Sequence, residues 1–324
     1  MAFQLTHRDE QTLFALQKLP LTSQQLYRLS QTFSHSFPSE RVLRRRMRRL
    51  EEEGMARRFY YAFPSDGRNP AYWRLTRRSF RLINGLTGEA PLPRRSFFSP
   101  MGVSLHFHSH RTSEIVVELL VQAYRNGIAV GELSVESNLT LNDGEWLTPD
   151  AKLILLTPDG RLLRFMIEVD TGTERVATLQ KIPSSIQKKL EFYERYRRCS
   201  SEPFRVLFVT TSSKQRALNI LRFGACLSHN QSAQSIYAAF LPDVLEATDC
   251  LTEQVFSNHR LDPVSLVTPK RFCPVMPGTK RIMAHLSQKE FTPLRPPATI
   301  DNHQCESQRS TKSPHWHESA IVSG

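Results

Sequence analysis

The stretch TPDAKLILLTPDGRLLRFMIEVDTGTE, residues 148–174, decides the fold of the central part of this chain. It holds two strand-like runs, 149–160 and 161–170, and the first run ends in a Pro-Asp-Gly turn, which is a strong signal for a β-hairpin. Antiparallel partners lie at matching distances from their turn. Asp150 and Glu168 are therefore predicted to be near cross-strand neighbours.

The carboxylates of this hairpin predict a metal site. Glu168 and Asp170 lie two residues apart on one predicted strand, so their side chains point to the same face. Carboxylates this close repel one another unless a divalent cation neutralises them, and Mg²⁺ or Mn²⁺ is held by such carboxylates together with phosphate oxygens. We therefore expect Asp150 and Glu168 to bind the metal, with Asp170 as a third candidate. The alternative is that Asp150 caps a turn and the other two are surface acids.

Apolar patterns on both sides of the hairpin predict the rest of a mixed sheet. The predicted elements are, in order, a helix over 111–125, a strand over 130–137, the hairpin, a helix over 174–198 that breaks near Pro183, a strand over 203–212, a helix from 214 to 224, and a strand over 235–242. The order α-β-β-β-α-β-α-β is typical of an α/β (α+β) fold with a mixed sheet.

The positive charge of the chain is concentrated in its first third. The chain has 324 residues, with 43 Lys and Arg against 31 Asp and Glu, and a net charge of +12. Residues 1–100 carry 18 basic and 8 acidic side chains, a balance of +10, whereas residues 101–260 carry 17 and 18. We expect a basic module joined to a neutral one. The basic module favours a polyanionic partner, either nucleic acid or an anionic membrane surface.

Three short helices are predicted within the basic module, over 8–18, 22–29 and 39–53, the last ending at Gly54. In the third helix, Leu43, Met47 and Leu50 are spaced to form one apolar stripe. The opposite side carries four arginines that repel one another unless an anion lies nearby: Arg41, Arg44, Arg45 and Arg48.

A predicted pair of strands around a turn at 65–70 follows the third helix. It carries four more arginines among aromatic residues: Arg57, Arg58, Arg68 and Arg74. Helix, helix, basic helix and basic hairpin is the order of a winged helix-turn-helix, in which the third helix enters the major groove and the wing touches the flanking backbone. All eight arginines are therefore expected to contact double-stranded DNA. The alternative is a solvated, arginine-rich helix beside an ordinary hairpin.

Three segments together resemble the core of the PD-(D/E)xK nuclease superfamily: TPDAKLIL (148–155), FMIEVDTGTE (165–174) and QKKLEFYERY (187–196). The chain is most similar to the replication-relaxation family of plasmid and mobile-element proteins, which is itself similar to the MobC-type relaxases of mobilisable plasmids. That family joins an N-terminal winged helix to a nuclease-like domain, and the YWRLT segment of the predicted wing (72–76) agrees with it. The resemblance covers about residues 8–245.

The resemblance implies roles for individual acids. Asp150 and Glu168 match the metal-binding carboxylates of the superfamily. Glu114 or Glu118, on the helix before the first strand, matches an acid that this helix often supplies, and Glu118 is our candidate for a further metal ligand.

The resemblance also exposes one departure from the superfamily pattern. The pattern places a lysine two residues after Glu168, where it orients the attacking water or steadies the phosphate, but this chain has Asp170. The lysine is then expected from Lys152 on the second strand, or from Lys188 or Lys189 on the following helix. Because binding-only relatives also lack the lysine, both a catalytic and a non-catalytic domain remain open.

Other motifs favour less specific interpretations. His106-Phe107-His108 fits the His-hydrophobe-His metal motif of rolling-circle relaxases, but no nucleophilic tyrosine precedes it, and the segment is expected in the linker or the approach to a helix. Tyr193 and Tyr196 are candidate nucleophiles for a covalent DNA intermediate, although tyrosines three apart more often pack a helix against its sheet. Cys199 has no histidine nearby in sequence.

The predicted organisation has three parts: a winged helix-turn-helix over 1–95, a PD-(D/E)xK-like domain over 96–260, and a mostly disordered tail over 261–324 that is rich in Pro, Ser, Thr and His. No apolar run of about 18 residues predicts a membrane span, and the N-terminus shows no secretory signal. The five scattered cysteines argue against a disulfide framework, so a reducing cytoplasm is expected.

Two functions are carried forward from these observations. The first is a Mg²⁺- or Mn²⁺-dependent DNA endonuclease, a relaxase-like nickase that acts on double-stranded DNA at an origin of transfer or replication. The second is a non-catalytic replication or mobilisation accessory factor, and a transcriptional regulator ranks below both. Other mobilisation proteins are expected partners in either case.

Overall fold

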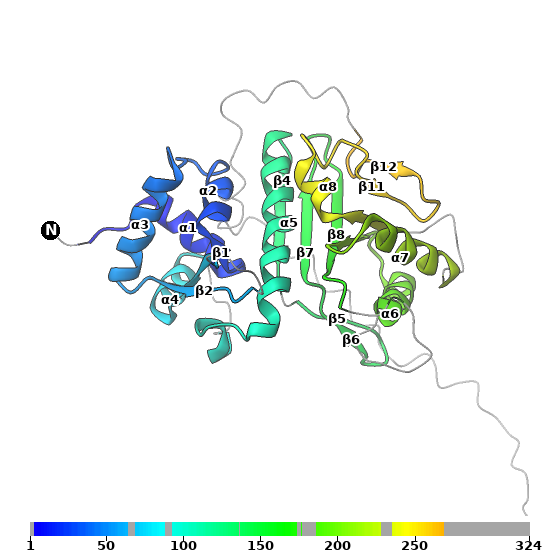
Figure 1. Ribbon diagram of the computed structural model, residues 1–324, viewed down its shortest axis with the longest axis horizontal. Helices are drawn as coiled ribbons and strands as arrows, with labels where there is room; N and C mark the ends of the chain where they lie inside the picture. The colour runs from blue at the N-terminus through cyan, green and yellow to red at the C-terminus, as the bar shows by residue number, and fades with distance from the viewer. Residues whose placement is uncertain are drawn as a thin grey trace, which may run out of the picture. The chain divides into compact units, whose positions relative to one another are not determined.

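The computed structural model describes residues 3–63, 69–87, 93–135, 137–173, 176, 186–227 and 235–268, and these belong to one compact unit (Figure 1). Within these residues the protein is an α/β structure, as predicted, with a four-helix N-terminal module and a mixed seven-stranded sheet. None of the described helices is long and apolar enough to cross a membrane. Most of the predicted tail, from residue 269 onward, lies outside the described residues.

The N-terminal module has the predicted winged helix-turn-helix order. It comprises α1 (His7–Lys18), β1 (Leu21–Thr22), α2 (Ser23–Ser30), α3 (Glu40–Glu52), β2 (Ala56–Tyr60), β3 (Ala71–Leu75) and α4 (Arg77–Thr87). The two strands of the wing are antiparallel, and β1 adds to the outer side of β3.

Local side-chain contacts explain where these helices begin and end. Thr22 and Gln25 form a reciprocal capping box at the start of α2, and the Ser39 hydroxyl accepts a hydrogen bond from the Val42 amide at the start of α3. After α3, Gly54 adopts a φ of 67°, which lets the chain reverse into the wing at little steric cost. The predicted stripe of Leu43, Met47 and Leu50 is fully buried.

The sheet runs in the order β12-β11-β10-β9-β8-β7-β4. Its strands are β4 (Ala129–Ser134), β7 (Ala151–Leu156), β8 (Leu162–Asp170), β9 (Arg205–Thr210), β10 (Ile236–Phe240), β11 (Phe256–Ser257) and β12 (Pro263–Val264). Strands β7 and β8 form the predicted antiparallel hairpin, while β8, β9 and β10 are parallel to one another. The pairing of Ala151 with Ile167 places Asp150 directly across from Glu168 in the same register.

Two helical layers cover the two faces of this sheet. One apolar cluster joins α5 (His106–Arg125) and α8 (Leu241–Glu246) to residues such as Ile167 and Val169 of β8. A second cluster joins α6 (Ile186–Cys199) and α7 (Lys214–Leu227) to the opposite face, including Met166 of β8. Because side chains alternate along a strand, Glu168 and Asp170 fall on the α6–α7 face.

Several short elements were not predicted. They are the β5–β6 pair (Leu139–Thr140 with Trp146–Leu147), the short 3₁₀ helices η1 (Arg95–Phe98) and η2 (Val103–Leu105), α8, β11 and β12. Helix α5 also begins five residues before its predicted start, so the His106–His110 segment is helical rather than part of a linker. Pro263 and Val264 add an edge strand to the sheet and Leu266 and Val267 are buried, so the folded chain extends past the predicted end at 260.

The winged helix packs directly against α5. The Ser113 hydroxyl donates to the Pro20 carbonyl at 2.8 Å, the Gln25 amide donates to the His110 carbonyl at 3.3 Å, and Arg28 of α2 forms an ion pair with Glu118. In the segment between the two modules, Phe98 is buried against Phe80 of α4. The predicted boundary at residue 95 therefore falls in a segment that is packed onto the winged helix.

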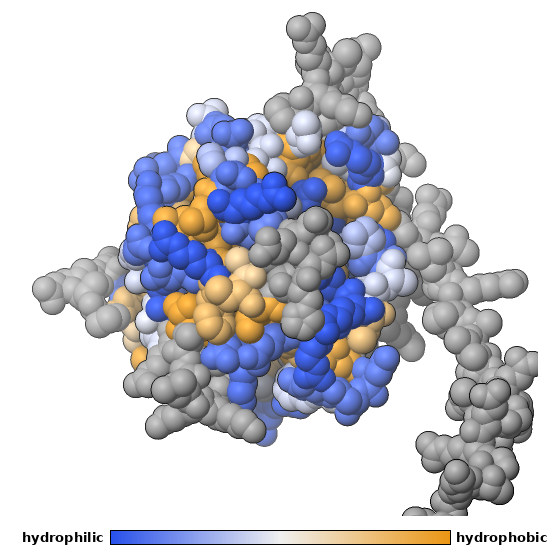
Figure 2. Space-filling view, turned by 90° about the vertical axis from the view of Figure 1, so that its right-hand side faces the viewer, coloured by the Kyte–Doolittle hydropathy of each residue, from blue (hydrophilic) through white to orange (hydrophobic). Residues whose placement is uncertain are grey.

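Polar and apolar side chains are intermingled on the face that Figure 2 shows, which is the side of α7 and β12. The apolar side chains reach the surface there in separate patches between hydrophilic ones, over the part of the face that is not drawn in grey.

A buried ion pair holds α1 against α3 and yields the first prediction. Asp9 is only 1% exposed and accepts a hydrogen bond from Arg46 Nε at 2.7 Å. We expect Arg46→Ala to lower the free energy of unfolding by about 3 kcal/mol, because it leaves a buried carboxylate without its partner. The exposed neighbour Arg45→Ala is expected to change it by less than about 0.5 kcal/mol in the same urea denaturation experiment.

The same ion pair makes the difference in the free energy of unfolding between wild type and Arg46→Ala depend on pH. Burial alone would raise the pKa of Asp9, but hydrogen bonds from Arg46 and Thr6 outweigh it and lower the pKa below its ordinary value of 3.8. A lowered pKa stabilises the fold above pH 3.8, and that stability is lost as the pH falls through the pKa of the folded state. A difference between wild type and Arg46→Ala that grew on acidification would contradict this assignment.

Candidate active site

Three elements bring their side chains together at one end of the β7–β8 hairpin. Asp150 immediately precedes β7, Glu168 lies near the end of β8, and His108 lies in the first turn of α5. Helix α6, which connects β8 to the parallel strand β9, adds Lys189 and Tyr193 from successive turns. Residues i and i+4 of a helix share one face, so both α6 side chains reach the same point on the sheet.

Asp150 is held by two hydrogen bonds. Its Oδ2 accepts the backbone N–H of Val169 at 2.7 Å, which ties it to the neighbouring strand. Its Oδ1 lies 2.8 Å from Nε2 of His108. Burial lowers the pKa of His108, but the hydrogen bond and the negative charge of Asp150 outweigh that effect, and the pKa is raised above its ordinary value.

Glu168 is buried, with 1% of its surface exposed. The Tyr193 hydroxyl donates to its Oε1 at 2.5 Å, and the ammonium group of Lys189 lies 3.1 Å from its Oε2. Burial raises the pKa of Glu168, Lys189 opposes that rise, and the charge of Asp150 adds to it, so that the pKa reaches about 7. The site therefore contains a carboxyl group that changes charge near neutral pH.

Asp170 faces the same side of the sheet but has a different set of partners. Its Oδ1 accepts hydrogen bonds from Arg216 Nη2 at 2.9 Å and from the Gly172 amide at 3.0 Å, and its Oδ2 accepts from the Thr210 hydroxyl at 2.8 Å and from Arg216 Nε. A bidentate pair with arginine occupies both oxygens. Asp170 thus anchors α7 to the sheet in this structure, and the expectation that it binds metal finds no support in its contacts.

The lysines expected to replace the missing one have different surroundings. Lys152 forms an ion pair with Glu132 of β4 at 3.3 Å. Lys189 is the lysine that reaches Glu168, while its neighbour Lys188, the other candidate on this helix, is turned by about 100° around the helix. Among the lysines named from the sequence, Lys189 of α6 is therefore the one that the structure places beside Glu168.

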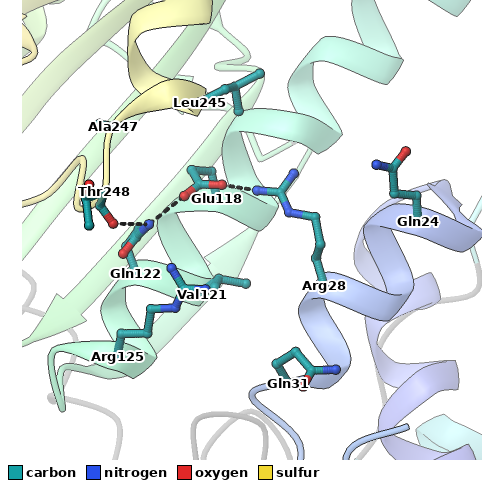
Figure 3. A pocket seen from close by; sticks show the side chains of 10 residues that line it. All are labelled: Gln24, Arg28, Gln31, Glu118, Val121, Gln122, Arg125, Leu245, Ala247 and Thr248. Atoms are coloured by element: carbon teal, nitrogen blue, oxygen red, sulfur yellow. Dashed lines mark hydrogen bonds and ion pairs between the residues drawn. The ribbon is translucent and has the colours of Figure 1, made fainter. Parts of the chain in front are cut away.

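The two acids proposed for α5 lie away from the hairpin. Glu118 is 10 residues beyond His108, which is about 15 Å along a helix. Glu118 lines a pocket of about 490 Å³ between α2 and α5. There it pairs with Arg28 and accepts a hydrogen bond from Gln122 (Figure 3). Glu114 pairs with Arg111 at 2.5 Å. Glu118 therefore does not lie beside Asp150, as it would have to if it were a ligand of the predicted metal site.

The candidate nucleophiles besides water are poorly placed to attack a phosphate. Tyr193 is buried with its hydroxyl turned to Glu168, and burial together with the charge of Glu168 raises its pKa well above the ordinary value. Tyr196 stacks on Phe192 at 6.0 Å and contacts Phe204. Both tyrosines pack α6 against the sheet, which agrees with the alternative interpretation of their spacing. Cys199 is an exposed free thiol at the end of α6.

The residues present fit a hard cation in one respect. As they stand, no three His, Cys, Asp or Glu side chains in the described part of the chain are arranged to hold a metal ion. Two adjacent carboxylates nevertheless suit Mg²⁺ or Mn²⁺, because Mg²⁺ keeps several waters and is commonly bound through one or two carboxylates and substrate phosphates. Burial is the main cause of the raised pKa of Glu168, and the negative charge of Asp150 adds to it, so a cation bound here would oppose both effects.

The arginines of the winged helix fall into two groups. Arg41, Arg44, Arg45 and Arg48 are all exposed along one side of α3, and Arg57 and Arg58 are exposed on β2. Arg44 pairs with Glu40 at 2.6 Å, and Arg58 lies 3.7 Å from Glu51. Arg74 instead donates to the carbonyls of Ser96 and Ser99, so it ties the wing to the segment that follows α4. Arg68 lies outside the described residues.

A family model described as replication-relaxation matches residues 16–236, which runs from α1 through the first residue of β10. The chain belongs to the replication-relaxation family. This membership points to a role in plasmid replication or mobilisation. No curated protein and no solved structure gives a significant match to the chain.

Two residues of this site, His108 and Tyr193, were not predicted from the sequence in their present roles. His108 was weighed only as part of a His-hydrophobe-His motif, because its contact with Asp150 joins residues 42 positions apart. Tyr193 was weighed as a nucleophile, whereas its contact is with Glu168. A signal for Lys189 and Tyr193 existed in their i, i+4 spacing, which predicts that both reach one neighbour on the sheet.

The raised pKa of Glu168 leads to a prediction about stability. A carboxyl whose pKa rises from 4.5 to about 7 on folding binds protons more tightly in the folded state, so wild type loses stability as the pH rises from 5 to 8. Glu168→Gln carries no such charge. Its free energy of unfolding relative to wild type is expected to rise by up to about 3 kcal/mol over that interval.

A matched substitution makes this measurement specific. Glu132→Gln removes a carboxylate that is 42% exposed from strand β4 of the same sheet, and its difference from wild type is expected to stay nearly constant between pH 5 and 8. Urea denaturation at pH 5, 6, 7 and 8 gives both curves. A flat difference for Glu168→Gln would mean that Glu168 is already ionised at pH 5.

Proposed function

We propose that this protein is a metal-dependent DNA-nicking enzyme that acts on double-stranded DNA at an origin of replication or transfer. The observation that carries the proposal is the grouping of Asp150, Glu168 and Lys189 at the open end of one hairpin. Adjacent carboxylates can hold a divalent cation for phosphodiester hydrolysis, and a lysine beside them can stabilise the charge that develops on the phosphate. Membership of the replication-relaxation family supplies the biological setting.

Each residue has a defined part in this proposal. Asp150 and Glu168 would hold Mg²⁺ or Mn²⁺, which, when bound, lowers the pKa of a water molecule and stabilises negative charge on the phosphate. Lys189 neutralises Glu168 in the free protein. Its ammonium group stands beside the metal-binding carboxylate, where it orients the attacking water or stabilises a phosphate oxygen in the transition state.

Water is the nucleophile that the geometry favours. A covalent phosphotyrosine would need an accessible hydroxyl, but the hydroxyl of Tyr193 is buried and bonded to Glu168. Its raised pKa also opposes formation of the phenolate. The proposed reaction is therefore hydrolysis, which leaves a free phosphate and a free hydroxyl at the nick.

The winged helix would deliver DNA to this site. Arg41, Arg45 and Arg48 are exposed on α3 and form no ion pair with any residue that the structure describes, so their charges are available to backbone phosphates. The packing of α2 on α5 ties this module to the helix that carries His108. DNA gripped by α3 would then be held in a constant relation to the carboxylates.

A non-catalytic accessory factor is the second candidate, and one observation favours it. Glu168 already has partners within the protein, since its Oε1 accepts a hydrogen bond from Tyr193 and its Oε2, which accepts no hydrogen bond, forms an ion pair with Lys189, and an ion pair of this kind can be purely structural. In that case the sheet would serve to grip DNA or a partner, and the winged helix alone would carry specificity.

A nicking assay separates the two candidates. Supercoiled plasmid carrying the origin of the replicon that encodes the protein is incubated with protein and Mg²⁺ or Mn²⁺, and open circles are quantified. We expect Asp150→Asn and Glu168→Gln to abolish nicking and Lys189→Met to slow it by about 100-fold. Lys188→Met removes the same charge one residue away and should retain most of the activity. Nicking that survives both carboxylate substitutions would refute the site, whereas inactive wild type with either metal would support the accessory role.

DNA binding by α3 is tested by its salt dependence. Each phosphate contact contributes about 0.9 to the slope of log K against log salt concentration, so Arg41→Ala/Arg45→Ala/Arg48→Ala should reduce the slope by about 2.7. The control Arg77→Ala/Arg78→Ala/Arg81→Ala removes three exposed charges from α4 instead. Equal losses for both triple variants, measured by filter binding, would mean that α3 is not the principal contact.

A further inference from the structure

The pocket between α2 and α5 is separate from the candidate active site. Its walls come mainly from α2, from the C-terminal half of α5, and from residues 245–248, which include the end of α8 (Figure 3). Arg125, in the last turn of α5, lies 17 residues beyond His108, which is about 25 Å along a helix. The volume of about 490 Å³ falls within the range of roughly 300–1,000 Å³ that is usual for small-molecule sites.

The charged side chains that line this pocket leave it with an excess of positive charge. Arg28 of α2 and Arg125 of α5 both line it, and Glu118 is the one acid among its lining residues. Arg28 forms an ion pair with Glu118, whereas Arg125 has no hydrogen bond or ion pair with the described part of the chain. The pocket therefore carries two cations and only one anion.

The two arginines lie close enough to repel one another. Burial lowers the pKa of Arg28, the negative charge of Glu114 opposes this effect, and the positive charge of Arg125 lowers the pKa further. An anion between the two guanidinium groups would replace this repulsion by attraction to both. The electrostatics of the pocket therefore favour a negatively charged ligand.

Phosphate is the anion that these side chains suit best. A guanidinium group presents five N–H donors in a planar fork that matches the oxygens of a phosphate. Arg28 donates to Glu118 through Nη2, and its side chain is 35% exposed, so its other donors can reach a ligand. Arg125 is exposed on the facing helix, and all of its donors are available.

The rest of the lining suits the base of a nucleotide. Val121, Leu245 and Ala247 form an apolar wall against which a flat ring can pack. Gln24 and Gln31 add side-chain amides from the α2 side, and Gln24 is exposed with no hydrogen bond to any described residue. An amide carries a donor and an acceptor side by side, as the edge of a nucleobase does.

We propose that this pocket binds a nucleoside phosphate, with the phosphates between Arg28 and Arg125 and the base against the apolar wall. The proposal goes beyond the proposed function and does not depend on it, because no lining residue belongs to the candidate active site. Since α2 and α5 both contribute to the pocket, a bound nucleotide would strengthen the packing of the winged helix on α5.

The experiment is isothermal titration of the full-length protein with ADP, at constant ionic strength and with EDTA to remove metals. We expect one ADP per protein, and Arg125→Ala should weaken binding by about tenfold, because it removes one of the two cations. Glu118→Gln removes the opposing negative charge and should strengthen binding by about threefold. Arg81→Ala removes an exposed arginine of α4 outside the pocket and is the matched control, with no change expected.

Fragments of the ligand test whether both of its parts are recognised. Pyrophosphate keeps the charge without the base, and adenosine keeps the base without the charge. Each should bind at least about tenfold more weakly than ADP, because each gives up one set of contacts. Pyrophosphate that binds as tightly as ADP would overturn the assignment of a nucleotide.

A short DNA duplex, titrated in the same buffer, tests the other source of phosphate. Absence of ADP binding, or ADP binding that Arg125→Ala leaves unchanged, would overturn the proposal. Duplex affinity that falls in Arg125→Ala by as much as the ADP affinity would also overturn it, because the ligand of Arg125 would then be a backbone phosphate. Selective loss of ADP binding supports the proposal. Because the titration contains no metal, a wild type that fails to nick DNA would leave this result unaffected.

Discussion

A carboxylate buried in the middle of a sheet constrains the rest of this structure. Glu168 is 1% exposed, and an unpaired charge at such a position would cost several kcal/mol. Helix α6 supplies its two partners, Lys189 as an ion pair and Tyr193 as a hydrogen-bond donor, which lie one turn apart. The parallel pairing of β8 with β9 needs a crossover, and the crossover is the element that carries these two residues. The topology of the sheet and the chemistry of the site are thus supplied by one segment.

The elements that could be predicted were those set by local pattern. The β7–β8 hairpin follows from two apolar runs around a Pro-Asp-Gly turn, and its register places Asp150 across from Glu168 as expected. The three N-terminal helices follow from their caps and from the stripe of Leu43, Met47 and Leu50. Strand pairing across a short turn and helix capping join residues that are close in sequence. A local sequence pattern is therefore sufficient to predict them.

The remaining features depend on contacts between distant segments. Lys189 rather than Lys188 faces Glu168 because of the rotation at which α6 lies on the sheet, and a single residue changes that direction by about 100°. The partner of Asp170 is Arg216, 46 residues away. The extra turn of α5 that carries His108 has no apolar periodicity to mark it, because its histidines contact Asp150 and the wing through polar and ring interactions. No local pattern carries that information.

The docking of α2 on α5 also bears on how such a protein changes over evolutionary time. Helix α5 presents one side to the sheet and the other to the winged helix, where Arg28, Gln25 and the Pro20 carbonyl all find partners on it. A winged helix taken from an unrelated protein would leave Glu118 without its arginine. Exchange of the winged helix by recombination would therefore succeed only when this surface of α5 is inherited with it. Substitutions on the exposed side of α3 leave these contacts with α5 in place, so that side of the module is free to diverge.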